Sequence, residues 1–129
     1  MIVRRLTEVP SVDWGNGHSR RFLLAADGMG FTLTDTLVRR GSTTRIEYPD
    51  HLEAVYCIAG SGELVEAGGG ASHEITPGTM YALDKHDAHF LVAGPDADLQ
   101  VVCVFVPALE GSEIAGPVIL EPGPPSLET

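Results

Sequence analysis

"YPDHLEAVYCIAGSGE", residues 48–63, is the stretch that decides the fold. Its centre, residues 54–58, is apolar at every position, which is typical of a strand that is buried on both faces. A carboxylate, Glu53, stands directly before this centre. Burying a carboxylate costs free energy unless the group is paired or binds a metal ion. Glu53 is therefore the first candidate for a functional residue.

Short apolar runs of the same kind follow one another along the chain, separated by its 15 glycines and 9 prolines. No segment keeps a helical period over ten residues, and many short, evenly spaced strands indicate a sandwich or a barrel. The glycine-rich stretch 66–74 indicates a hairpin connection. We expect strands at residues 2–6, 20–26, 30–39, 43–48, 52–58, 62–66, 72–75, 79–84, 88–93 and 99–106.

Composition limits the classes of function. The chain has 129 residues and is 43% hydrophobic, enough for one domain with a core, and its net charge of −10 disfavours nucleic acid and anionic membranes as partners. The first residues are too charged for a secretory leader, and the longest aliphatic run, 101–106, is too short to span a membrane. The two cysteines lie in apolar runs, so we expect free, buried thiols and a cytoplasmic protein.

The spacing of polar residues resembles the two metal-binding sequence blocks of the small β-barrels called cupins. Counting from Gly41, the first block places Glu53 at its glutamate position, but both of its histidines are replaced. Counting from Gly78, the second block places His89 at its histidine position. The sequence therefore predicts an all-β fold with a single cupin barrel (a double-stranded β-helix or jelly roll) at residues 1–120, followed by a flexible Pro-rich tail at 121–129.

Strand parity supports an inward-facing site, because side chains two residues apart share a face. Glu47, Pro49 and Glu53 have the same parity, so we expect that face to line the interior, whereas Tyr48 then needs a bulge or turn to face inward. Tyr81 is the candidate for a third donor. A carboxylate, a phenol and an imidazole favour Fe(II) or another first-row ion, with zinc as an alternative. The other interpretation is a barrel without metal, in which Glu53 binds backbone amides and Tyr81 packs in the core.

Four stretches together resemble the ectoine synthase family: MIVR at 1–4, HLEAVYCI at 51–58, PGTMYALDKHDAH at 77–89 and VVCVF at 101–105. The resemblance covers residues 1–113. It implies a cytoplasmic, homodimeric hydro-lyase that closes the ring of a small-molecule substrate, N4-acetyl-L-2,4-diaminobutyrate, with loss of water. The product is ectoine, a compatible solute made under osmotic stress. The implied cofactor is Fe(II), with Zn, Mn or Co as alternatives.

The resemblance also assigns site residues. The metal ligands of the family fall on Glu53, Tyr81 and His89, and its catalytic positions on Tyr81 and Glu113. The substrate-contacting positions are Ser19, Arg21, Thr36, Tyr48, Cys103 and Phe105. The histidines at 51 and 86 have the character of loop or strand-end residues, and we expect a smaller part for them.

Two departures from the family pattern lie outside the expected metal site. After the last core strand the family reads F-N-P-P-L-x-G-x-E-x-H, whereas this chain has Val106, Ala108 and Ala115 at the asparagine, second proline and histidine positions. The family motif W-x-S-x-R is also shifted, because Trp14 lies five residues before Ser19, which puts its place at the site in doubt. Three interpretations stay open: an ectoine synthase with a relaxed lid, an enzyme for another small N-acyl amino acid, or a cupin that only binds such a ligand.

Overall fold

The computed structural model describes residues 1–111 and 118–119. This part of the chain contains eleven β-strands and two three-residue 3-10 turns, Leu6–Glu8 and Ala25–Asp27, and no α-helix lies within it. The expected Pro-rich tail at 121–129 falls outside the described residues, as do Glu113 and Ala115. The described residues include no helix that is long and apolar enough to cross a membrane.

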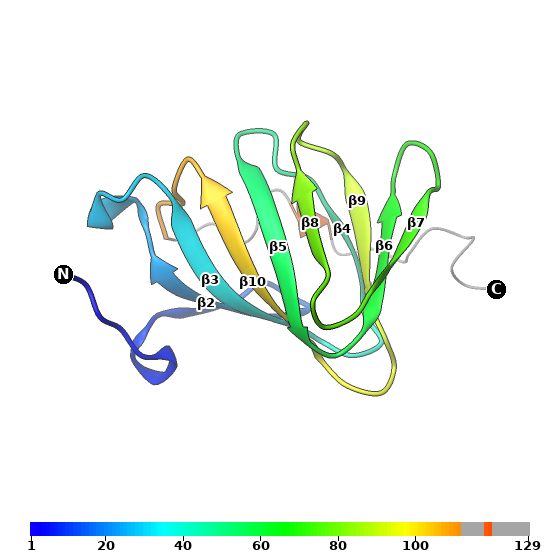
Figure 1. Cartoon of the computed structure of the whole chain (residues 1–129), viewed down its shortest axis with the longest axis horizontal. Coiled ribbons are helices and arrows are strands. Elements are labelled where there is room, and N and C mark those ends of the chain that lie inside the picture. The colour runs from blue at the N-terminus through cyan, green and yellow to red at the C-terminus, as the bar shows by residue number, and fades with distance from the viewer. Residues whose placement is uncertain (112–117, 120–129) are drawn as a thin grey trace.

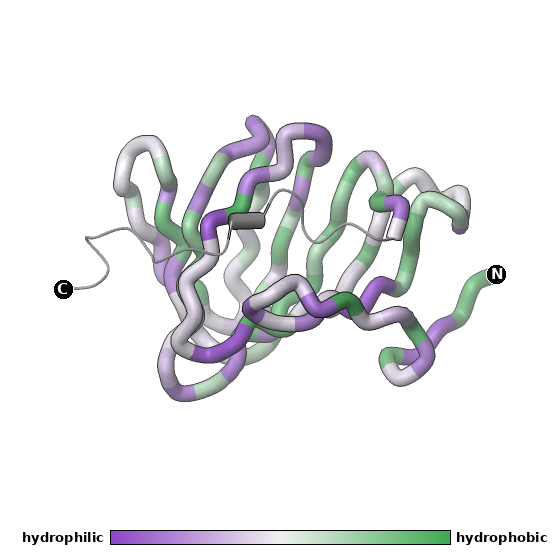
Figure 2. The backbone as a smooth tube through the Cα atoms, turned by 180° about the vertical axis from the view of Figure 1, so that it is seen from behind, coloured by the Kyte–Doolittle hydropathy of each residue, from purple (hydrophilic) through white to green (hydrophobic). Residues whose placement is uncertain are grey.

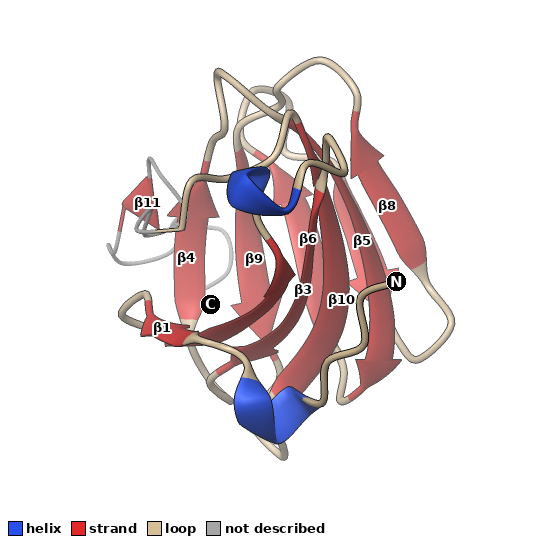
Figure 3. Ribbon diagram, turned by 90° about the vertical axis from the view of Figure 1, so that its left-hand side faces the viewer, coloured by secondary structure: helices blue, strands red, loops and turns tan. Residues whose placement is uncertain are grey.

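The strands form two antiparallel sheets that face each other, as Figures 1 and 3 show. The first sheet has six strands, in the order β1 (Ser11–Asp13), β2 (Gly17–Leu23), β3 (Thr32–Val38), β10 (Leu99–Val106), β5 (Leu52–Ala59) and β8 (Met80–Leu83). The second has five, in the order β11 (Val118–Ile119), β4 (Thr43–Ile46), β9 (His89–Ala93), β6 (Gly62–Glu66) and β7 (Ser72–Ile75). This arrangement confirms the predicted all-β barrel.

The core lies between the two sheets and is built by strand alternation. On β10, Leu99, Val101, Cys103 and Phe105 are buried, while the residues between them are more exposed. The facing sheet contributes residues such as Leu91 in the same way. Both cysteines are free and buried, as predicted. The tube coloured by hydropathy shows the mixture of apolar and polar positions along the strands (Figure 2).

The strand predictions were most accurate where a hairpin or a long apolar run fixes the ends. The strands at 62–66, 72–75 and 99–106 have the predicted bounds, and β6 pairs with β7 as the predicted hairpin. The prediction of a strand at 2–6 is wrong, because residues 1–5 are in no strand and pair with none of the strands that the structure describes. Instead, the guanidinium of Arg4 binds the carboxylate of Asp27 at 2.7 and 2.9 Å.

Candidate active site

A cavity inside the barrel gathers most of the predicted site residues. Its lining includes Glu53 and Tyr81 together with all six predicted substrate-contacting residues, namely Ser19, Arg21, Thr36, Tyr48, Cys103 and Phe105. Apolar side chains complete the wall, among them Val55, Val101 and Leu109. The free space is about 40 Å³, which is room for about one water molecule. A ligand as large as an acylated amino acid therefore has to displace some of these side chains.

The register of the six-stranded sheet explains how these residues meet. Cys103 on β10 lies opposite Thr34 on β3 and Val55 on β5, and Val55 in turn lies opposite Tyr81 on β8. One step along, Phe105 lies opposite Glu53. Because directly opposed residues in an antiparallel sheet point to the same side, these rows all face the interior. The pairing of the strands in this sheet thus brings the site together, and β10 supplies three of its side chains, Val101, Cys103 and Phe105.

Glu53 is held in a chemical environment that opposes its charge. Burial raises the pKa of its carboxyl to about 8, and a hydrogen bond with the thiol of Cys103 offsets part of that effect. The carboxyl therefore carries a proton at neutral pH when no cation is near. A bound cation would favour the ionised form, which is the form that ligates metals. Glu53 thus enters the barrel as the parity of β5 predicted.

His89 presents a buried ring nitrogen whose lone pair is available to a ligand. It begins β9, is only 2% exposed, and its Nδ1 lies 2.9 Å from the carbonyl oxygen of Asp87. A carbonyl can only accept, so Nδ1 carries the proton and Nε2 presents a lone pair. That Nε2 atom is buried and has no hydrogen-bond partner among the described residues. Burial also lowers the pKa of the imidazole, which keeps it neutral and suited to bind a metal ion.

Tyr81 connects His89 to the cavity. Its ring lies across from His89, with centroids 6.0 Å apart and planes inclined at 70°. Burial, followed by the charge of Glu53, raises the pKa of its phenol well above the ordinary value. Tyr81 lines the cavity on one side and, together with His89, an open groove between β8 and the β6–β7 hairpin on the other. His89 itself lines the groove and does not appear in the cavity wall.

Glu53, Tyr81 and His89 carry the kinds of donor atoms that first-row metal ions bind, with the phenol of Tyr81 as the third donor. The described residues contain no group of three or more histidine, cysteine, aspartate or glutamate side chains placed to hold a metal. Glu53 and His89 supply two donors of those types, and Tyr81 is the additional oxygen donor beside them. The unpartnered Nε2 of His89 and the raised pKa of Glu53 are both features that a bound cation would relieve.

Tyr48 faces the cavity, but not for the predicted reason. The inward positions of β4 are even-numbered, so Ile46 and Tyr48 are buried while Glu47 lies outside near Arg45. The prediction that Glu47 faces inward with Glu53 is therefore wrong, and no bulge is needed. The parity changes in the loop between β4 and β5, after which the odd-numbered residues of β5 face inward. The ring of Tyr48 packs against Phe105, with centroids 4.9 Å apart.

The histidines at 51 and 86 support this loop instead of lining the cavity. The Nδ1 of His86 lies 2.9 Å from the carbonyl oxygens of both Tyr48 and His51. The Nδ1 of His51 lies 2.8 Å from the carbonyl oxygen of Pro107, and its ring lies edge-on to Tyr48. The two side chains thus join the turns that follow β4, β8 and β10, in keeping with their predicted smaller part.

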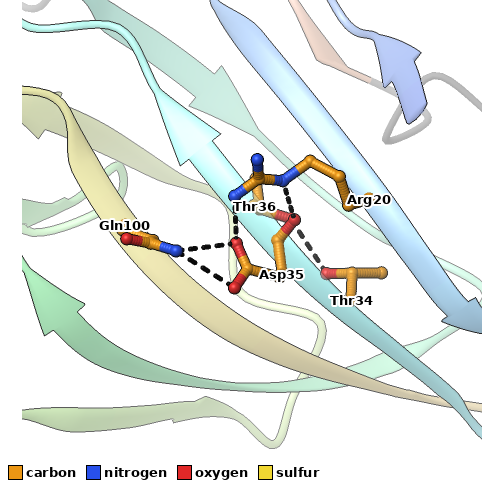
Figure 4. Close-up of polar contacts among 5 residues, drawn as sticks. All are labelled: Arg20, Thr34, Asp35, Thr36 and Gln100. Carbon is orange, nitrogen blue, oxygen red and sulfur yellow. Dashed lines mark hydrogen bonds and ion pairs between the residues drawn. The ribbon is translucent and has the colours of Figure 1, made fainter. Parts of the chain in front are cut away.

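On the outer face of β2 and β3, behind the cavity, Arg20 and Asp35 form an ion pair, which Figure 4 shows. Asp35 lies between Thr34 and Thr36 on β3 and therefore points away from the cavity. Its carboxylate pairs with Arg20 on β2 and accepts hydrogen bonds from Gln100 on β10 at 3.1 Å. On the inner face, the hydroxyls of Thr34 and Thr36 lie 2.9 Å apart. Burial raises the pKa of the nearby Cys103 thiol well above its ordinary value, and the two threonines offset part of that effect.

Trp14 is the residue whose place sequence analysis could not settle. It is 4% exposed and lines the cavity next to Ser19 and Arg21. Thr34 and Leu109 were not predicted at all, although both are buried at the site. A threonine at alternating positions, as at 32, 34 and 36, was the available signal for Thr34. Glu113 is not among the described residues, so its place at the site stays a prediction.

Comparison with known proteins adds a consistent set of relatives. Residues 1–117 match the family described as ectoine synthase. An L-ectoine synthase of Desulfatibacillum aliphaticivorans is 49% identical over 119 residues, which cover 88% of this chain and 90% of the relative. The crystal structure of ectoine synthase from P. lautus superimposes with a TM-score of 0.87 at 45% identity, covering 96% of this chain and 92% of that one. A cupin 2 conserved barrel protein from Salinispora arenicola shares the fold, with a TM-score of 0.67 at 21% identity and coverage of 82% and 88%.

Proposed function

Since the chain belongs to the ectoine synthase family and is a hydro-lyase of that type, we propose that its ring closure depends on a metal ion held by Glu53, Tyr81 and His89. Fe(II) is the first choice for this oxygen-rich set, with Zn, Mn or Co as alternatives. The observation that carries the proposal is the buried, unpartnered Nε2 of His89 beside the Tyr81 ring. When bound, the ion would polarise an acyl oxygen and stabilise developing negative charge.

The side chains of the cavity would hold the substrate in a folded conformation. In N4-acetyl-L-2,4-diaminobutyrate the free α-amine has to reach the acetamide carbonyl of the same molecule. Arg21, Ser19 and Thr36 supply polar contacts on the β2–β3 side, while Phe105 and Tyr48 enclose the carbon chain. Holding the two reacting groups together removes much of the entropic cost of the reaction. The apolar wall also excludes bulk water, whose attack would reverse the condensation.

Proton transfers complete the proposed role of the site. The α-amine attacks as a neutral amine, so it needs a base, and the departing oxygen leaves as water, so it needs an acid. We assign these transfers to Tyr81 and Glu113. Tyr81 is the phenol next to Glu53, and the ionised carboxylate of Glu53 favours the protonated phenol. Glu113 rests on the family motif alone, because it lies outside the described residues.

A turnover assay tests the proposal. Iron-loaded protein is mixed with N4-acetyl-L-2,4-diaminobutyrate without oxygen, and ectoine is followed by NMR. Ectoine formation that disappears in Tyr81→Ala supports the reaction and the site together. Folded, metal-loaded protein that makes no ectoine would favour the second candidate function, conversion or binding of another small N-acyl amino acid. The substitutions at Val106, Ala108 and Ala115 are the observation that favours this second candidate.

A homodimer is the assembly that we propose. The outer face of β10, β5 and β8 carries a row of exposed apolar residues: Leu52, Tyr56, Ile58, Met80 and Val106. Val102, Tyr56 and Met80 lie directly opposite one another across the three strands. Continuous apolar faces of this kind mark contacts with another protein. A molar mass of about twice 13.7 kDa by light scattering would support the dimer, and a monomer at micromolar concentration would contradict it.

The cytoplasm is the compartment that we propose. Both cysteines are free thiols in the interior, which suits a reducing environment. The acidic balance of the chain disfavours partners such as nucleic acid and anionic membranes.

A further inference from the structure

A groove lies between β8 and the β6–β7 hairpin, apart from the cavity that gathers the proposed substrate-binding residues. β7 is the last strand of the five-stranded sheet and β8 the last strand of the six-stranded sheet, and the two follow one another along the chain (Figure 1). The groove has a free volume of about 870 Å³. The buried residues Leu64, Ile75 and Leu83 form its apolar part. The proposed reaction takes place in the cavity and does not use this space.

The charged residues of the groove are mostly acidic. Its lining contains four carboxylates, at Glu66, Glu74, Asp84 and Asp87, against one lysine, Lys85. All four acidic residues are exposed, so water supports their negative charge. His73 lines the groove as well, and its Nε2 lies 2.7 Å from a carboxylate oxygen of Glu66. A cleft lined by charge of one sign concentrates ions of the opposite sign and speeds their association roughly 10- to 1,000-fold.

His89 connects this groove to the proposed metal site. It lines the groove, it is only 2% exposed, and its Nε2 has no hydrogen-bond partner among the described residues. Tyr81 lines both the groove and the cavity, whereas Glu53 lines the cavity. The three proposed ligands therefore lie between the two spaces, with the unpartnered nitrogen on the residue that belongs to the groove.

The cavity offers a divalent cation a less favourable approach. A first-row divalent ion in water carries about six water molecules of about 30 Å³ each, so the hydrated ion fills roughly 200 Å³. The cavity has about 40 Å³ of free space, whereas the groove has about 870 Å³. The guanidinium of Arg21 also places a positive charge in the cavity wall, which repels a cation. Size and charge therefore both favour approach through the groove.

We propose that the carboxylates of the groove attract the metal ion and deliver it to His89 and Tyr81 from outside the substrate cavity. The inference rests on the proposed function, since it takes Glu53, Tyr81 and His89 as the ligands. It adds separate entrances, one through the groove for the ion and one through the cavity for the substrate. Glu74 and Asp84 act while the ion approaches and are not ligands of the bound ion.

The rate of metal uptake by the full-length, metal-free protein tests the proposal, with Co(II) alone as the probe. Protein and Co(II) are mixed rapidly, excess chelator stops the uptake at set times, and protein-bound Co(II) is measured by mass spectrometry. Asp84→Asn and Asp84→Lys change the charge of the groove in two steps, and Glu74→Gln repeats the neutralisation at a second position. Asp96→Asn is the matched control, because Asp96 is exposed and lies beyond the end of β9 opposite to His89.

The expected effect is kinetic and depends on salt. We expect the association rate constant to fall about 3-fold in Asp84→Asn and in Glu74→Gln, and about 10-fold in Asp84→Lys, at low ionic strength. The final Co(II) content should equal that of the wild type, because neither residue is a ligand. At about 1 M KCl, where the Debye length is about 3 Å, these differences should largely disappear. Asp96→Asn should take up Co(II) at the wild-type rate in both conditions.

The possible failures of the two proposals are distinguishable. Asp84→Lys and Glu74→Gln that load as fast as Asp96→Asn, with a full equivalent bound in each, would refute the groove entrance and leave the proposed metal site standing. Slower loading that high salt does not restore would indicate a structural effect of the substitutions and would also refute the groove entrance. A wild type that retains no Co(II) would overturn the proposed ligands and this inference with them.

Discussion

The rings of Tyr81 and His89 meet nearly edge to face, with centroids 6.0 Å apart, at the boundary between the inner cavity and the outer groove. One residue comes from β8, at the edge of the six-stranded sheet, and the other from β9, inside the five-stranded sheet. The proposed metal site therefore lies between the two sheets of the barrel, which share no β-ladder among the described strands. A bound ion would connect them, which leads to the first prediction.

Removing the phenol oxygen should weaken metal binding without unfolding the protein. Tyr81→Phe keeps the ring and its contact with His89 but loses one of three proposed donors. We expect iron content after dialysis to fall at least tenfold, turnover to be lost, and the melting temperature of the metal-free protein to stay within about 4 °C of the wild type. Metal content by mass spectrometry and calorimetry of the same samples check this. Full iron content in Tyr81→Phe would exclude the phenol as a ligand.

Substitutions of Glu53 test the proposed metal site through its carboxylate ligand. Glu53→Ala should abolish metal binding and leave a folded barrel, as judged by circular dichroism. Glu53→Gln is the matched variant, because it keeps the volume of the side chain and cannot ionise. We expect Glu53→Gln also to lose the metal, while the metal-free protein near pH 6 keeps the stability of the wild type. Either variant retaining a full equivalent of metal would show that the ligand set is wrong.

The raised pKa of Glu53 also predicts how the stability of the metal-free protein depends on pH. Below the usual carboxyl pKa near 4.5 the group is protonated in both the folded and the unfolded state. Between that value and about 8 only the folded state keeps the proton, so the free energy of unfolding falls as pH rises. The slope from this group is at most about 1.4 kcal/mol per pH unit.

Urea unfolding of metal-free protein from pH 5 to pH 9 measures this slope, and Glu53→Gln should remove this contribution. If the free energy of unfolding changes with pH in the same way in the wild type and in Glu53→Gln, the carboxyl of Glu53 is not held protonated in the folded protein. Metal binding has the opposite dependence on pH, because the Glu53 carboxyl has to lose its proton before the carboxylate can bind the ion. Metal affinity should therefore increase with pH up to about 8.

Substitutions at two neighbouring residues on β3 should distinguish effects on substrate binding from effects on stability. Thr36 faces the cavity and Asp35 faces outward, where it binds Arg20 and Gln100 (Figure 4). We expect Thr36→Val to raise KM several-fold with little change in stability. We expect Asp35→Ala to cost about 1–3 kcal/mol of stability, since it leaves Arg20 without its carboxylate partner, and to leave KM nearly unchanged. Chemical denaturation and steady-state kinetics on both variants decide this, and the opposite pattern would place Thr36 outside the substrate site.

Local patterns were sufficient to predict much of the site. Glu53 lies inside because β5 alternates regularly, and His89 begins β9, at the end of the block counted from Gly78. Tyr48 shows the limit of parity, because the change of face occurs in a loop whose course depends on tertiary contacts such as those of His86. Trp14 shows another limit. Its place depends on Gly17, whose missing side chain matters only once the turn and the Leu37 carbonyl are known.

The strand predicted at 2–6 failed for a related reason. Its residues have strand-forming character, and the backbone tube shows an apolar N-terminal end (Figure 2). A strand, however, requires a partner for its backbone groups, and no strand of the described chain is paired with it. Sequence reports the preference of a segment, whereas pairing depends on the surface that is available to it.

The hydrogen bond that fixes His89 has a consequence for how the site tolerates mutation. The acceptor is the main-chain oxygen of Asp87, so every amino acid at position 87 offers the same acceptor. The path of the backbone, and not the side chain at position 87, therefore fixes the tautomer of the imidazole. Relatives can diverge in the turn before β9, including its charge, and still present Nε2 in the same protonation state. In this respect the site is insensitive to sequence drift in the turn that positions it.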